Sequence, residues 1–101
     1  MTKVFISQPM GDKTEHEILE ERANVFQIAK ESFPDAELID SYFDEYKPTN
    51  GNVALKYLAK SLELLADADV AYFAPGWDDA RGCQIENECA IKYGIEVHEI
   101  Y

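Results

Sequence analysis

Residues 75–82 concentrate side chains that could bind or react with a small molecule. The segment holds an indole, two carboxylates and a guanidinium between two glycines: Gly76, Trp77, Asp78, Asp79, Arg81 and Gly82. An indole can stack on a planar ring, a carboxylate can attack carbon or carry a proton, and a guanidinium can pair with an anion. These residue types in one short segment predict a site for a small ligand.

Glu86 follows this segment, in the first turn or so of a predicted helix. An acidic side chain near a helix N-terminus is stabilised by about 0.3–1 kcal/mol through the helix dipole, whatever its function. Position alone therefore favours an electrostatic role for Glu86 over a catalytic one.

The elements that must position these residues alternate in type along the chain. Four short apolar runs are typical of strands: residues 4–6, 36–40, 70–74 and 95–100. Apolar residues at helical spacing lie between the runs, from Thr14 to Phe33, from Ala54 to Leu65, and between Gly82 and Gly94. Thr14 and Glu17 match a capping box at the start of the first helix. Residues 41–52 are predicted to form a loop.

This βαβαβαβ order predicts the fold class. Strands separated by helices require right-handed crossovers, which place the strands parallel and the helices on both faces of the sheet. We therefore expect a single α/β domain over residues 1–101, Rossmann- or flavodoxin-like, with a mainly parallel four-stranded sheet. Its length of 101 residues supports one core and no second.

Charge narrows the range of partners. Nine Lys and Arg against 20 Asp and Glu give a formal net charge of −11. A surface this acidic repels phosphate backbones and anionic lipid, so we expect no nucleic-acid or membrane partner. His16 and His98 have no cysteine at ligand spacing, and we expect no metal and no cofactor. Two cysteines and no long apolar run predict a cytoplasmic protein with free thiols.

The fold predicts where a ligand would bind. In an open parallel sheet the ligand crevice lies beyond the carboxyl ends of the strands. Residues 7–13, the chain from Asp40 onward and residues 75–82 all follow predicted strands, so they belong at that edge. Asp69 begins a strand instead, and it is predicted to lie at the opposite end.

Four segments then resemble a known group of enzymes. They are Ile6-Ser7-Gln8-Pro9-Met10, Ala68-Asp69-Val70, Pro75-Gly76-Trp77 and Gly82-Cys83-Gln84-Ile85-Glu86. Together they resemble the nucleoside 2-deoxyribosyltransferase superfamily, which includes 2′-deoxynucleoside 5′-monophosphate N-glycosidases. The likeness covers most of the chain in element order, and its most specific part is the Gly-x-x-x-Glu pattern that opens a helix. It implies that Gly82 is the motif glycine and Glu86 the nucleophile.

The resemblance implies cleavage or transfer at the N-glycosidic bond of a (deoxy)nucleoside or its 5′-monophosphate, through a glycosyl-enzyme intermediate. Asp79 is then the first candidate for general acid or sugar-hydroxyl acceptor. The implied substrate-binding residues lie in the two loops: Ser7, Gln8, Pro9, Met10, Gly76, Trp77, Asp78, Arg81 and Gly82.

Each of these roles has a simpler structural alternative. Ser7 and Gln8 could equally form a turn that ends a strand. Trp77 stacks on the base in one interpretation and is buried at a subunit contact in the other. Arg81 pairs either with a 5′-phosphate or with Asp79.

The sequence departs from the superfamily pattern at three assisting positions. The first-strand tyrosine has no counterpart in residues 4–6, Ser61 stands nearest to the usual helix aspartate, and Gln8 replaces a frequent glycine. These changes motivate a second hypothesis, a non-catalytic nucleotide-binding module that sequesters or senses a nucleotide. Relatives complete their pockets with a neighbouring subunit, so we expect a homo-oligomer, dimeric or larger.

Overall fold

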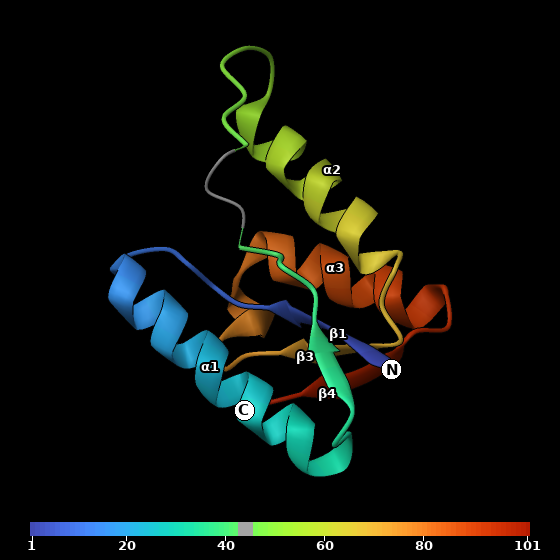
Figure 1. Ribbon diagram of the computed structural model, residues 1–101. Helices are drawn as coiled ribbons and strands as arrows, with labels where there is room; N and C mark the ends of the chain where they lie inside the picture. The colour runs from blue at the N-terminus through green and yellow to red at the C-terminus, as the bar shows by residue number, and fades with distance from the viewer. Residues whose placement is uncertain (43–45) are drawn as a thin grey trace.

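The computed structural model describes residues 1–42 and 46–101 (Figure 1). Its elements are β1 (Thr2–Ser7), α1 (Glu15–Ser32), β2 (Ala36–Leu38), α2 (Val53–Leu65), β3 (Val70–Phe73), a short 3-10 helix (Trp77–Asp79), α3 (Arg81–Lys92) and β4 (Glu96–Glu99). The predicted alternation of strands and helices is confirmed. Part of the predicted loop 41–52, residues 43–45, lies outside the described residues.

All four strands pair in parallel, in the order β2-β1-β3-β4. The register places Val4 beside Val70 and Ser7 beside Phe73, so β1 and β3 end at the same level. Because β1 lies in the middle of the sheet between β2 and β3, the loops after β1 and β3 start next to each other. The chain segments that hold Ser7 and Gly76 are thereby brought together.

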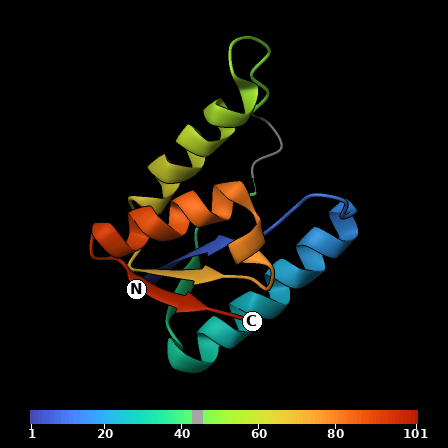
Figure 2. The same cartoon turned by 180° about the vertical axis from the view of Figure 1, so that it is seen from behind.

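Helices cover both faces of the sheet, as predicted, with α1 on one face and α2 and α3 on the other (Figures 1 and 2). The alternation of side chains along β1 divides the core accordingly. Val4 and Ile6 pack with Val25 of α1, whereas Phe5 packs in the second cluster, with Cys83 of α3. The two clusters hold α1 and α3 rigidly against the central strands.

Local signals set most helix boundaries. The Thr14 side chain accepts from the Glu17 N–H, and the Glu17 carboxylate accepts from the Thr14 N–H, which completes the predicted capping box. Gly94 follows α3 with a φ of +78°, in the left-handed conformation that glycine adopts after a helix. The sequence did not predict the 3-10 helix, which forms where Gly76 turns the chain with a φ of +87°.

The N-terminal half of α2 extends beyond the sheet in both views (Figures 1 and 2). Only Leu65, at its C-terminal end, is buried among the helix residues. Asn52 caps its start by accepting from the Leu55 N–H at 3.0 Å. Across the described part of the chain, neither α2 nor any other helix has the length and apolar character needed to cross a membrane.

Candidate active site

A cavity of about 280 Å³ opens at the carboxyl edge of the sheet, where the crevice was predicted. Its floor is the end of β1 and the loop after it, residues 6–10. Two helices supply the walls, with Ala54, Tyr57, Leu58 and Ser61 from α2, and with Gly82, Cys83 and Glu86 from the start of α3 and Ala80 just before it. The cavity therefore depends on three elements that are distant in sequence.

Glu86 is the central polar group of this cavity. The residue is 6% exposed, and both of its carboxylate oxygens accept hydrogen bonds. The Ser7 hydroxyl donates to Oε1 at 2.6 Å, and the Ser61 hydroxyl donates to Oε2. Two donors on one carboxylate fix its orientation and favour its ionised form.

Burial works against that ionised form. Removal from water raises the pKa of Glu86 above its ordinary value of 4.5, and the hydrogen bonds from Ser61 and Ser7 oppose this rise. A carboxylate in such surroundings is less solvated than one at the surface. It is therefore better suited to attack carbon or to take a proton.

Cys83 lies beside Glu86 and also lines the cavity. Burial raises the pKa of its thiol to about 11, although a contact with Ser7 lowers it in part. The thiol is therefore protonated at neutral pH and is a poor nucleophile. Of these two groups, the carboxylate of Glu86 is the stronger candidate for a nucleophile.

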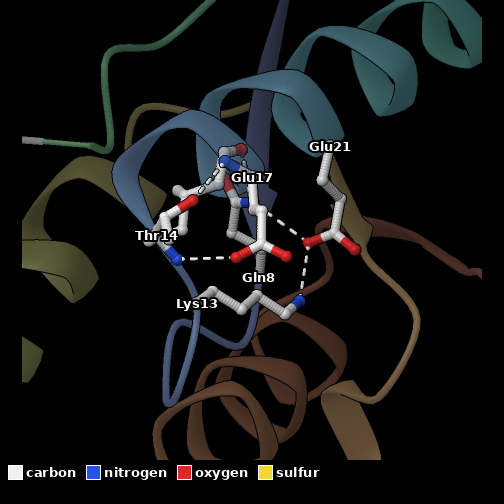
Figure 3. A network of polar contacts seen from close by, with 6 residues as sticks. Gln8, Lys13, Thr14, Glu17 and Glu21 are labelled. Carbon is white, nitrogen blue, oxygen red and sulfur yellow. Dashed lines mark hydrogen bonds and ion pairs between the residues drawn. The ribbon is translucent and has the colours of Figure 1, made fainter.

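Gln8 anchors the loop after β1 to helix α1 (Figure 3). Its Nε2 donates to the Ile18 carbonyl oxygen at 3.0 Å and to Glu21 Oε1 at 3.1 Å, and Glu21 also pairs with Lys13 at 3.2 Å. Its Oε1 is buried and has no hydrogen-bond partner among the described residues. The amide thereby holds the cavity floor that includes Pro9 and Met10.

Only part of segment 75–82 lines the cavity. Gly82 lines the cavity, whereas Gly76, Trp77, Asp78 and Asp79 are not among the described residues around it. Arg81 is exposed and lines a neighbouring cavity between α2 and α3.

Trp77 is buried by packing within the chain. Its ring lies 5.7 Å from that of Phe73 and 6.0 Å from that of Tyr101, centroid to centroid. The turn before the 3-10 helix, closed by the Trp77 N–H donating to the Ala74 carbonyl, leads the indole against the end of β3. The sequence could not distinguish this burial from a stacking role, because both require an aromatic residue in the same loop.

Three cavity residues were not assigned a site role from the sequence. Ser61 was identified only as the counterpart of a helix aspartate, and Tyr57 lies one helical turn before it, on the same face of α2. Ser41 donates to the Ile6 carbonyl oxygen at 3.0 Å and lines the cavity near β2. The spacing of four between Tyr57 and Ser61 is the signal that could have placed both at the site.

The chain was also compared with known proteins. No family model, curated protein or solved structure matches it. No group of three or more His, Cys, Asp or Glu in the described ranges is placed to hold a metal ion. The geometry around Glu86 is therefore the main source of functional information.

Proposed function

We propose that this protein cleaves or transfers the N-glycosidic bond of a nucleoside-type substrate, with Glu86 as the nucleophile. The observation that carries the proposal is the arrangement of Glu86, buried at the carboxyl edge of the sheet and held at both oxygens by Ser7 and Ser61. The resemblance of the Gly82–Glu86 segment to the nucleoside 2-deoxyribosyltransferase superfamily supports the same assignment. This membership is part of the proposal.

The proposed reaction has two steps. One Glu86 oxygen forms a bond to C1′ of the sugar as the C1′–N bond breaks, and the electron pair leaves with the base. Water, or the nitrogen of a second base, then attacks C1′, and the C1′–O bond breaks to release the carboxylate. The proton of the attacking group passes to the group that protonated the departing base. Ser7 and Ser61 keep the carboxylate oriented through both steps, so that little reorganisation is needed when the bond forms.

The departing base must gain a proton. Asp79, the first candidate from the sequence, is exposed and is not among the described cavity residues. Tyr57 does line the cavity, on the same helix face as Ser61. The proposal therefore assigns proton delivery to the Tyr57 phenol, with solvent entering the open cavity as the other source.

A second candidate function is a nucleotide-binding module without turnover. The observation that favours it is the absence of a second carboxylate besides Glu86 among the described cavity residues. Many glycosidases use two carboxyl groups, one of them as the acid. Tight binding of a ligand that is recovered unchanged would support this candidate.

The test is chromatographic detection of free base after incubation with nucleosides and their 5′-monophosphates. Wild-type protein should release base from at least one substrate, and Glu86→Ala should abolish the release. Glu88→Ala is the matched control, because Glu88 lies on the same helix but is exposed and pairs with Lys92 at 3.3 Å. Equal release by wild type and Glu86→Ala would refute the mechanism.

The proposal includes a homo-oligomer. α2 exposes large apolar side chains on the part that extends beyond the sheet, including Leu55 at 59% and Tyr57 at 37% exposure. A second copy that covered this helix would also close one wall of the cavity. Sedimentation equilibrium should therefore give a mass of at least two chains, and a monomeric mass would contradict this part.

A cytoplasmic location also belongs to the proposal. Both Cys83 and Cys89 are free thiols, and free thiols suit a reducing compartment. Fractionation of cells that express the protein would test the location.

A further inference from the structure

The cavity around Glu86 contains no positively charged side chain. The sequence has nine Lys and Arg, none of them in residues 43–45, and none is among the described residues that line the cavity. Among the described lining residues, the one group that can carry a charge at neutral pH is the carboxylate of Glu86. An anionic group of a ligand would therefore meet a like charge and no side-chain counterion.

Two basic side chains on the segments around the cavity have other partners. Lys13 pairs with Glu21 at 3.2 Å. Besides the effect of burial, the charge of Lys13 lowers the pKa of the cavity thiol Cys83 and that of Glu21 raises it, so the two charges oppose each other at the cavity. Lys56, on α2, donates to the Asn50 side-chain oxygen at 2.6 Å.

Arg22 is buried against the end of β2. Its Nη2 donates to the Ile39 carbonyl oxygen at 2.8 Å, and Asp40 lies close enough to stabilise its charge. Its Nη1 is buried and has no hydrogen-bond partner among the described residues, and the guanidinium is not among the described groups that line the cavity. Apart from Glu86, the described lining is apolar, hydroxyl-bearing or amide.

Arg81 is the one basic side chain in an adjoining space. It lines a second cavity, which shares Ala54, Leu58 and Gly82 with the first. The side chain is exposed to water, so its attraction for an anion is screened by solvent and salt. The free N–H groups at the start of α3 also attract anions, but the Glu86 carboxylate already lies within reach of their field.

We propose that the Glu86 cavity takes an uncharged nucleoside in preference to the corresponding 5′-monophosphate, an inference that rests on the proposed glycosidic function. The sugar would lie against Glu86 and the two serines, and the base against the apolar wall that includes Met10 and Leu58. A phosphate dianion in the same cavity is repelled by the carboxylate at a distance of several ångströms. The net charge of −11 opposes its entry as well.

The experiment compares matched pairs of 2′-deoxynucleosides and their 5′-monophosphates at equal ionic strength, with released base as the measurement. We expect kcat/KM for the nucleoside to exceed that for the monophosphate by at least about tenfold, which corresponds to about 1.4 kcal/mol. An equal or higher value for the monophosphate would overturn the inference. A monophosphate preference that Arg81→Ala abolishes would place the phosphate in the adjoining cavity and would overturn it too.

A variant that adds a positive charge tests whether electrostatic repulsion causes the preference for the nucleoside. Met10 lines the cavity and is 40% exposed, so Met10→Lys can place an ammonium at the rim without burying it. It should reduce the nucleoside preference at least about threefold relative to Met10→Gln, which changes the side chain without adding charge. Equal ratios for the two variants would show that repulsion is not the cause and would count against the inference.

If the proposed glycosidic function itself is wrong, the same experiment gives a different result from a wrong substrate preference. If neither substrate of any pair releases base, the glycosidic function is wrong, and titration calorimetry with the same pairs then decides the ligand class. Tighter binding of the nucleoside would keep the inference, and tighter binding of the monophosphate would end it.

Discussion

Replacing Ser61 by alanine should raise the pKa of Glu86 and make the loss of stability depend on pH. The variant removes the hydroxyl that donates to Glu86 Oε2 and leaves the bond from Ser7 to Oε1. A hydrogen bond to a charged group contributes about 1.5–3 kcal/mol. A bond to the neutral carboxyl contributes only about 0.5–1.5 kcal/mol. The difference of about 1–1.5 kcal/mol between the two forms, at about 1.4 kcal/mol per pH unit, should raise the pKa of Glu86 by about 1 pH unit.

The sign of the stability effect follows from the direction of this shift. The pKa of Glu86 in the folded protein is already above its ordinary value of 4.5, because burial outweighs the two hydrogen bonds. The stability that comes from the neutral carboxyl is therefore fully present below pH 4.5 and is lost as the pH rises through the folded pKa. Ser61→Ala enlarges this loss, because the ionised form then has one donor fewer.

Urea unfolding at pH 4 and pH 7 measures the effect, with the fluorescence of Trp77 as the probe. We expect Ser61→Ala to lower the free energy of unfolding by about 1.5–3 kcal/mol at pH 7 and by about 0.5–1.5 kcal/mol at pH 4, where the lost partner is neutral. Ser41→Ala is the matched control, since Ser41 is a cavity serine that donates to the uncharged Ile6 carbonyl. Its cost should be the same at both pH values.

One result would refute the reasoning. If Ser61→Ala lost the same free energy at pH 4 and pH 7, the hydroxyl would not be stabilising a charge on Glu86. Repeating the substitution in a Glu86→Gln background confirms the cause, because the pH dependence should vanish when no carboxylate can form. Activity, where present, should show the same shift, with the ascending limb of its pH profile moved to higher pH in Ser61→Ala.

Other predictions concern the elements around the site. Gly76→Ala should lower the free energy of unfolding by about 1–2 kcal/mol, because a side chain is strained at a φ of +87°. The control is Gly11→Ala, which has open space around the added carbon. In the same urea titrations it should change the free energy of unfolding by less than about 0.5 kcal/mol. Thr14→Ala should lower the free energy of unfolding by about 1 kcal/mol, because the capping box is lost. An unchanged urea midpoint would contradict this prediction. Ellman's reagent at pH 8 should modify Cys89 before Cys83 in the folded protein, because the pKa of the buried Cys83 thiol is about 11, and a faster reaction at Cys83 would show that it is not held as described.

Local patterns were sufficient for most of the fold. The capping box at Thr14, the helical spacing of apolar residues and the four short apolar runs depend on neighbours within a few positions, and so they predict elements without knowledge of the fold. The parallel sheet followed from their order, because strands joined by helices allow few other connections. The same rule placed residues 7–10 and Gly82 at one edge, where the cavity lies.

The sequence predicted the positions of the candidate site residues in segment 75–82 less well. It could show that Trp77 and Asp79 follow a strand, but it could not show which way a short turn directs each side chain. A 3-10 helix packs the indole against Phe73 and leaves the carboxylate exposed. The direction depends on the shape of the core beneath the turn, which no local pattern contains.

The sequence by itself determined the α/β class and the edge of the sheet where a ligand would bind, and it predicted Glu86 as the candidate nucleophile. Only the tertiary structure decided that Glu86 is buried and held by Ser7 and Ser61, which lie 79 and 25 residues away along the chain. The physical reason is that these three side chains meet where β1, α2 and α3 pack together. Which side chains of two elements touch depends on how the elements cross and which faces they bury. The periodicity of apolar residues shows only which face of a single element is apolar.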